Sequence, residues 1–209
     1  MTKQWNIKGQ PTADQLAEIA NLLRAGGVLL LPTDTIYGLH AVVTDERAVS
    51  RIAEVKGRDE GKPFVVIAAS LEQLEAIGTI FPPHALRALQ SLWPAPLTAI
   101  VPLRRPIAAS RGTSTLAVRV PDLAWLRGLL ETIGPLASTS ANRSGESPVE
   151  VPHQLARDLL ERVDGIVDSG PLSREPSTIV DFTGDEPRVI RDGDAFFTQK
   201  VWKTLRKTL

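Results

Sequence analysis

The stretch Val28-Leu29-Leu30-Leu31-Pro32-Thr33-Asp34-Thr35-Ile36-Tyr37-Gly38-Leu39 joins two patterns that decide the fold. Residues 28–31 are wholly apolar, which is typical of a short strand buried on both faces of its sheet. Residues 33–39 follow that strand directly and are rich in hydroxyl groups. The chain therefore passes from a predicted core strand straight into a polar segment.

Strand and helix patterns alternate on both sides of this stretch. Apolar runs predict further strands at residues 41–43, 64–68, 97–101, 116–120, 136–138, 165–168, 177–181 and 188–191. Capping or proline residues predict helix starts at Thr12, Thr44, Ser70, Pro83, Asp122 and Pro152, and a last helix covers about 196–209. Alternating strands and helices indicate an α/β fold. Because the helices are not strictly interleaved, we expect a single domain over residues 1–209, with a mixed parallel and antiparallel sheet flanked by helices.

The composition excludes several classes of site. None of the 209 residues is cysteine, which excludes a disulfide scaffold, a cysteine-ligated metal and a thiol nucleophile. The three histidines lie far apart in the sequence, so no metal ligand is assigned. A G-x-S-x-G elbow for a serine nucleophile is missing from the sequence. The start has no signal-peptide core and the longest apolar run has six residues, so we expect a cytoplasmic protein without a membrane segment.

Positive charge is distributed unevenly along a chain that is neutral as a whole. The 24 lysines and arginines balance 24 aspartates and glutamates, which argues against a protein that coats nucleic acid by bulk electrostatics. Residues 76–121 nevertheless hold five arginines and no acid, and residues 195–209 hold four basic residues and no acid. This distribution points to a positive site in the middle of the chain.

Three cations fall within the segment Lys56-Gly57-Arg58-Asp59-Glu60-Gly61-Lys62-Pro63, at the end of a predicted helix. Cations at that position complement the helix dipole, so one interpretation is a solvated helix end. The segment fails the Walker A pattern, because three residues separate its glycines and a proline follows its last lysine. Spaced lysines and arginines are also what a triphosphate site without a P-loop would use. Both interpretations stay open at this point.

Three other segments are candidates for ligand contact. Residues 138–145 (STSANRSG) follow a buried strand, and they fit either a serine or Asx turn or a ligand loop at a strand end. Arg119 lies inside an apolar strand, where a charge is costly unless it is paired. It either faces solvent, pairs with a distant acid, or binds a carboxylate or phosphate of a ligand. Residues 176–181 and 188–193 predict a strand pair that ends in a basic residue.

Taken together, six motifs resemble those of the YrdC family, the threonylcarbamoyl-AMP synthases, and they occur in that family's order. They are PTDTIYGL (32–39), KGR with KP (56–58 and 62–63), VRVP (118–121), STSAN with SG (138–142 and 144–145), STIVD (177–181) and RDG (191–193). The resemblance covers about residues 12–193 and is to the short single-domain members. It implies a twisted mixed α/β sheet with a concave, positively charged face.

The resemblance implies a nucleotidyltransferase reaction. L-threonine, bicarbonate and ATP would give threonylcarbamoyl-AMP and pyrophosphate, the first step of tRNA threonylcarbamoyladenosine modification. Threonine's amine would capture carbon dioxide and the carbamate oxygen would attack the α-phosphate, so the enzyme needs no nucleophile and works by positioning and charge neutralisation. We expect Mg²⁺ to accompany ATP, and the product to pass to a separate tRNA threonylcarbamoyltransferase.

The resemblance also assigns roles by position. The implied catalytic residues are Lys56 and Arg58. The implied threonine-binding residues are Thr33, Thr35, Arg119 for the carboxylate, Ser138 and Ser140. The implied nucleotide- and phosphate-binding residues are Lys56, Arg58, Lys62, Thr115, Ser140, Asn142, Ser177 and Arg191. Two positions depart from the family: His40 stands where glycine is more common, and Ile67 stands where larger members have a histidine that helps to bind threonine.

Two alternatives to the synthase stay open. The first is a paralogue of the same family that uses a different acid in place of threonine. The second is an RNA-binding protein that holds double-stranded RNA or tRNA on the positive concave face. Neutral charge and few aromatic residues disfavour stacking of single strands. The basic terminal helix is interpreted as a docked helix with a solvated polar face, with RNA contact as the lesser alternative.

Overall fold

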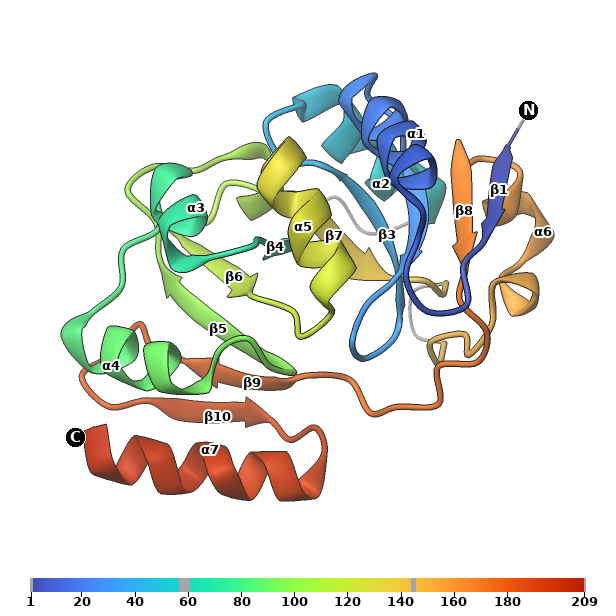
Figure 1. Cartoon of the computed structure of the whole chain (residues 1–209). Coiled ribbons are helices and arrows are strands. Elements are labelled where there is room, and N and C mark those ends of the chain that lie inside the picture. The colour runs from blue at the N-terminus through green and yellow to red at the C-terminus, as the bar shows by residue number, and fades with distance from the viewer. Residues whose placement is uncertain (1, 57–60, 144–145, 209) are drawn as a thin grey trace.

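The structure is a computed structural model that describes residues 2–56, 61–143 and 146–208. These residues build one sheet of ten strands in the order β1-β8-β2-β3-β7-β4-β6-β5-β9-β10 (Figure 1). The strands are β1 Lys3–Asn6, β2 Leu29–Pro32, β3 Tyr37–Val42, β4 Val65–Ile67, β5 Leu97–Pro102, β6 Thr115–Arg119, β7 Leu136–Ser140, β8 Gly165–Asp168, β9 Thr178–Asp181 and β10 Arg188–Arg191. The pairs β1–β8, β2–β8, β4–β6 and β5–β9 are parallel, while β2–β3, β3–β7, β4–β7, β5–β6 and β9–β10 are antiparallel. The predicted mixed sheet is confirmed.

Helices cover both faces of this sheet. They are α1 Ala13–Arg24, α2 Glu46–Lys56, α3 Leu71–Ala76, α4 Pro83–Leu92, α5 Ala124–Ile133, α6 Arg157–Leu160 and α7 Ala195–Thr208, with short 3-10 turns at Ala108–Ser110 and Pro152–Gln154. One core joins α1 and α5 to strand residues such as Leu29 and Leu31. The other joins α2, α4 and α7 to Leu30 and to Leu39, the residue of β3 that pairs with Leu30. Because alternate residues of a strand face opposite sides, the two cores lie on the two faces, and the layered α/β fold is confirmed.

Residues 28–39, which indicated the fold in the sequence, form a buried strand followed by a polar segment, as predicted. All four residues of β2 are buried, and α1 ahead of it begins at a full capping box. Gln15 N–H donates to Thr12 Oγ1 at 3.2 Å, and Thr12 N–H donates to Gln15 Oε1 at 2.9 Å. Gly26 closes that helix with φ +83°, a backbone conformation that favours glycine. The hydroxyl-rich segment is shorter than its composition suggested, because β3 already begins at Tyr37.

Two predicted helix caps are wrong. Asp45, and not Thr44, caps α2, because its Oδ1 accepts two backbone N–H groups of the first turn at 3.0 Å each. α5 has Leu123 at its cap position with no side-chain hydrogen bond. Asp122 instead accepts from the Arg127 side chain at 3.2 Å.

Two other local predictions need correction. The helix expected from Pro152 splits into a 3-10 turn and α6, because Leu155 and Ala156 between them are extended. Strand β1 was missed, because only Trp5 of its four residues is buried and the others are polar. This strand pairs with β8 in parallel at one edge of the sheet.

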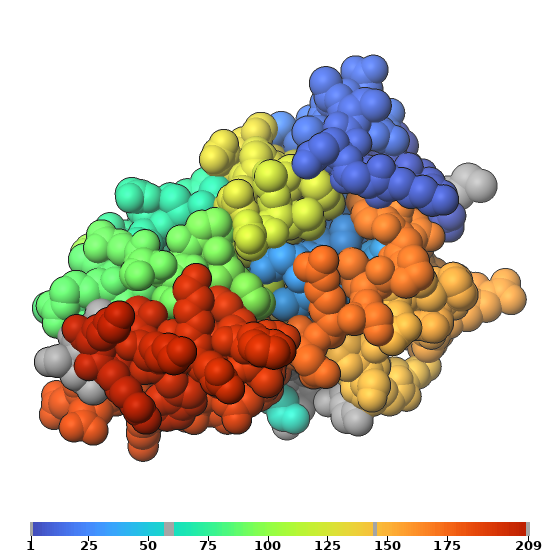
Figure 2. Space-filling model, turned by 60° about the horizontal axis from the view of Figure 1, so that its bottom comes forward, coloured from blue at the N-terminus to red at the C-terminus, as the bar shows by residue number. Residues whose placement is uncertain are grey.

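The terminal helix α7 docks on α4, as predicted for residues up to 208. Its Val201 and Leu205 are buried in the core, whereas Phe196 and Trp202 remain exposed. Figure 2 shows α7, in red, lying on the surface of the molecule. No helix of the described residues, α7 included, is long and apolar enough to cross a membrane.

Candidate functional site

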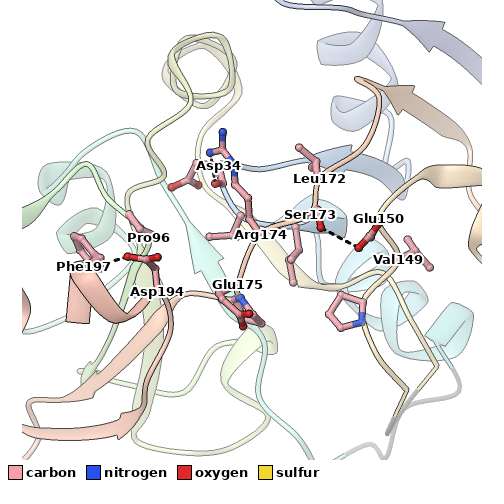
Figure 3. A pocket seen from close by; sticks show the side chains of 14 residues that line it. Asp34, Pro96, Val149, Glu150, Leu172, Ser173, Arg174, Glu175, Asp194 and Phe197 are labelled. Atoms are coloured by element: carbon pink, nitrogen blue, oxygen red, sulfur yellow. Dashed lines mark hydrogen bonds between the residues drawn. The ribbon is translucent and has the colours of Figure 1, made fainter. Parts of the chain in front are cut away.

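Two neighbouring cavities lie where the loop between β2 and β3 meets the segment before β9. The smaller measures about 250 Å³ and the larger about 670 Å³ (Figure 3 shows the larger). Both are lined by Thr35, Ile36, Pro148 and Pro176, so the cavities share a wall. Most of the predicted site residues line the smaller cavity, namely Thr33, Thr35, Arg119, Ser138, Ser140, Ser177 and Arg191. Residues far apart in the sequence are therefore brought together as the motifs implied.

The buried charge beside the smaller cavity is an ion pair between Arg119 and Asp34. Arg119 ends β6; its Nη2 donates to Asp34 Oδ1, and its Nη1 donates to Thr35 Oγ1 at 2.9 Å. The two charged side chains are 7% and 4% exposed. Of the interpretations drawn from the sequence, pairing with a distant acid is the one observed. Sequence reasoning missed Asp34 as that partner, although the PTDT motif places it between two predicted threonine contacts. A ligand carboxylate that binds Arg119 would therefore bind a guanidinium group that is already paired with Asp34.

The hydroxyl groups of Thr33 and Thr35 form a chain that ends on Arg119. Thr33 Oγ1 donates to the carbonyl of Ile36 at 2.8 Å and lies 3.0 Å from Thr35 Oγ1. Because the Thr33 hydroxyl has one proton, Thr35 is the donor in the second bond, and it accepts from Arg119 in turn. The backbone N–H groups of Thr35 and Ile36 reach Thr33 Oγ1 at 3.2 Å each. These bonds fix the side chain of Thr35 on the wall that both cavities share.

Lys56, at the end of α2, is buried against the loop that follows β7. Its Nζ lies 2.7 Å from the carbonyl of Ser140, 3.0 Å from Ser140 Oγ, 3.0 Å from Thr139 Oγ1 and 3.3 Å from Asn142 Oδ1. With 6% exposure, its ammonium is not the solvated helix end that one interpretation proposed. Asn142 in turn donates to the carbonyls of Arg143 and Glu146, at 2.7 and 2.6 Å. Lys56 therefore holds the serine-rich loop in place directly behind Ser140.

Arg191 reaches the smaller cavity from the C-terminal strand pair. Its Nε and Nη2 donate to the carbonyl of Ser177 at 3.1 and 2.8 Å. Ser177 Oγ lies 2.8 Å from Thr98 Oγ1, which anchors this segment to β5. Burial, and secondarily the charge of Arg119, lower the pKa of the Arg191 guanidinium. Two guanidinium groups thus line one small cavity, of which that of Arg119 is paired with Asp34.

Four predicted residues that the structure describes, Lys56, Asn142, Lys62 and Thr115, do not line either cavity. Lys62 is exposed beyond α2. Thr115 is half-buried at the start of β6, where its carbonyl accepts from Thr113 Oγ1 at 2.9 Å. Arg58 lies outside the described residues. The roles assigned to these residues, as to the residues that line the cavities, stay predictions.

His40 is fully buried next to the smaller cavity, in β3. Burial lowers its pKa to about 3, against a backbone hydrogen bond with Leu31 that raises it, and the charge of Arg119 lowers it further, so the ring is neutral at pH 7. Neither ring nitrogen has a well-aligned hydrogen bond among the described residues, and the polar contact of the ring is with the backbone of Leu31. A Cβ on Gly38, which lines the cavity, would lie 2.8 Å from His40 Nε2 and 3.0 Å from the carbonyl of Thr139. The imidazole therefore fills the space beside Gly38 and requires glycine there. The other departure, Ile67, lines the cavity itself.

The arrangement can bind anions and orient them. Arg119 and Arg191 supply forked donors for carboxylate or phosphate oxygens, and the serines of β7 supply hydroxyl donors. Within residues 2–56, 61–143 and 146–208, no three His, Asp or Glu side chains come together as a metal site.

Comparison with known proteins identifies relatives across most of the chain. Residues 21–193 match the family profile Sua5/YciO/YrdC, which is described as "Telomere recombination". The threonylcarbamoyl-AMP synthase of Bacillus subtilis is 38% identical over 202 residues, which cover 92% of this chain. The chain spans 58% of the length of that relative, and the same share of the threonylcarbamoyl-AMP synthase of Pyrococcus abyssi.

Solved structures agree with this relationship. P. abyssi Sua5 in complex with L-threonine superposes with a TM-score of 0.86 at 33% identity, over 96% of this chain and 61% of that one. Escherichia coli YciO superposes with a TM-score of 0.82 at 27% identity, over 93% of this chain and 97% of that one. The fold is therefore shared with proteins of this group.

Proposed function

The chain belongs to the Sua5/YciO/YrdC family, and from this premise we propose that it converts L-threonine, bicarbonate and ATP to threonylcarbamoyl-AMP and pyrophosphate. The observation that carries the proposal is the smaller cavity, in which Arg119, Arg191 and the serines of β7 converge. A carboxylate and a phosphate chain are the two anionic parts of these substrates, and two guanidinium groups match them.

In this proposal each side chain binds or orients a substrate. Arg119 holds the threonine carboxylate, with Thr35 fixing its Nη1. Arg191 and Ser177 hold nucleotide oxygens, and Lys56 positions Ser140 and Asn142. Bicarbonate takes up a proton and loses water to give carbon dioxide, and the threonine nitrogen bonds to its carbon and loses a proton. A carbamate oxygen then attacks the α-phosphorus and pyrophosphate leaves, so no enzyme nucleophile takes part. Any Mg²⁺ would arrive with the triphosphate, because the described residues build no cage for it.

The product would serve a later enzyme. Threonylcarbamoyl-AMP is a mixed anhydride, and its acyl group would pass to an adenosine of tRNA on a separate transferase. We place the reaction in the cytoplasm, the compartment that holds both ATP and tRNA.

The second candidate is a paralogue that uses another acid. It is favoured by one observation, the superposition with E. coli YciO over 97% of that protein's chain. A panel of amino acids and hydroxy acids in the same assay separates the two candidates, because a synthase releases pyrophosphate fastest with threonine.

The test of the main proposal is threonine-dependent release of pyrophosphate in wild type and two Arg119 variants. Arg119→Ala should abolish release. Arg119→Lys keeps the positive charge but lacks the two parallel N–H donors of the guanidinium group. It should raise the KM for threonine by about 10- to 100-fold. Arg157→Ala, which removes an exposed arginine paired with Glu161, is the matched control and should change nothing. Unchanged turnover in both folded Arg119 variants would reject the carboxylate role.

A further inference from the structure

The ion pair between Arg119 and Asp34 leaves one buried donor and one buried acceptor unused. Asp34 Oδ1 and two nitrogens of Arg119 are bonded. Asp34 Oδ2 and Arg119 Nε are buried and have no hydrogen-bond partner among the described residues. A buried donor or acceptor that makes no hydrogen bond lowers the stability of the folded state. A ligand that offers one acceptor and one donor would satisfy both.

We propose that Asp34 binds the α-ammonium group of the amino-acid substrate while Arg119 binds its α-carboxylate. This inference builds on the proposed function and adds a second recognition residue to it. An α-amino acid carries an acceptor for Arg119 Nε and a donor for Asp34 Oδ2 a few atoms apart. Asp34 Oδ2 is negative and Arg119 Nε is positive, so each is opposite in charge to the amino-acid group it would bind, and the two side chains are already in contact.

The position of the pair between the cavities supports this role. Arg119 lines the smaller cavity, Asp34 lines the larger one, and Thr35 lines both. Arg174 donates to the backbone carbonyl of Asp34 at 3.0 Å, which leaves the carboxylate to Arg119 (Figure 3). An amino acid at the shared wall would reach both members of the pair.

Other acids near the site are less suited to this role. In the described parts of the chain, no acid lines the smaller cavity. Glu150, Glu175 and Asp194 line the larger cavity but are exposed. Two of them already have partners, since Glu150 accepts from Ser173 at 3.0 Å and Asp194 from the N–H of Phe197 at 2.8 Å. Asp34 is the buried acid in direct contact with the arginine.

Charge balance gives the inference a consequence for specificity. A zwitterion brings one positive and one negative charge to the pair, so each buried charge remains compensated. A hydroxy acid brings only a negative charge, and its neutral hydroxyl can donate to Asp34 but cannot compensate the charge of that carboxylate. The site should therefore reject hydroxy acids of the same shape.

The experiment compares two ligands on three proteins by calorimetry. The ligands are L-threonine and the matching 2,3-dihydroxybutanoate, in which a hydroxyl replaces the ammonium group. Wild type should prefer threonine by about 10- to 100-fold, the range of a charge-assisted hydrogen bond. Asp34→Asn should lose this preference, because the amide neither attracts nor orients the ammonium group as a carboxylate does. Glu175→Gln, an acid-to-amide change in the same cavity wall, should keep it, and the KM for ATP should stay within about threefold in all three.

The outcomes separate this inference from the proposed function. If wild type forms threonylcarbamoyl-AMP but Asp34→Asn keeps the full preference, the inference is wrong and the function stands. A loss of ATP binding in place of threonine binding would also overturn it. If wild type neither binds threonine nor forms product, both fail. Should Asp34→Asn not fold, wild type alone decides, because equal binding of the two ligands contradicts a role for Asp34.

Discussion

Acidification should destabilise this protein in part through His40, and the structure fixes the size of the effect. His40 is neutral and fully buried, with a pKa of about 3, whereas an exposed histidine titrates near 6.5. The folded state therefore favours the neutral ring. The contribution of the neutral His40 ring to the free energy of unfolding is complete above pH 6.5 and is lost as the pH falls from 6.5 towards 3.

The magnitude follows from linkage between protonation and folding. Each pH unit below about 6.5 removes about 1.4 kcal/mol from the free energy of unfolding, as long as the pH stays above the folded pKa. Between pH 6.5 and 4.5 the loss from this one residue is about 2–3 kcal/mol. Carboxyl groups also titrate in this range, so the comparison needs a variant that lacks only the imidazole.

The variant is His40→Leu, which fills similar space and has no proton to bind. Urea unfolding of wild type and His40→Leu should be measured at pH 7, 5.5 and 4.5. At pH 7 the variant should be as stable as wild type or more stable, because two ring nitrogens without a well-aligned hydrogen bond are removed. Towards pH 4.5 its advantage should grow by about 2–3 kcal/mol. His153→Leu, at an exposed position, should show no growing advantage. Parallel pH dependence of wild type and His40→Leu would refute the assignment of a buried neutral ring.

Three further predictions concern the cavity. Lys56→Met removes an ammonium group that lies near four oxygens of residues 139–142. It should lower turnover at least about 100-fold and increase hydrogen exchange in residues 139–143. Unchanged exchange in these residues would contradict the anchoring role of Lys56. Gly38→Ala should lower the free energy of unfolding by about 1–3 kcal/mol, because its Cβ meets His40 Nε2 at 2.8 Å; adding His40→Ala should recover part of the loss in urea unfolding, and no recovery would show that the clash lies elsewhere. Arg191→Gln should raise the KM for ATP by about 10-fold or more while threonine affinity in calorimetry stays within about threefold; the reverse pattern would move Arg191 to the amino-acid site.

The framework of the fold could be predicted because each buried strand is a short apolar run between turn residues. β2 is the clearest case, since all four of its residues are buried. β1 could not be found this way, because an edge strand with one buried residue leaves no period in the sequence. The cap at Asp45 was also missed, because Thr44 beside it carries a side-chain acceptor too, although aspartate is the more common N-cap residue.

The candidate site could be predicted in its residues but not in its pairings. Motifs located Arg119, Ser140 and Arg191, yet the partner of Arg119 lies 85 residues away, and only the folded sheet brings the two together. Lys56 shows the same limit. A cation at a helix end is usually solvated, and this one is buried because the loop after β7 folds over it.

The most direct test of the central claim is mass detection of the product. Purified protein would be incubated with L-threonine, ATP and ¹³C-labelled bicarbonate. The account predicts threonylcarbamoyl-AMP that carries the label, with an equal amount of pyrophosphate, and no product when threonine is omitted. Pyrophosphate release that is independent of threonine, or the absence of labelled product from folded protein, would contradict it.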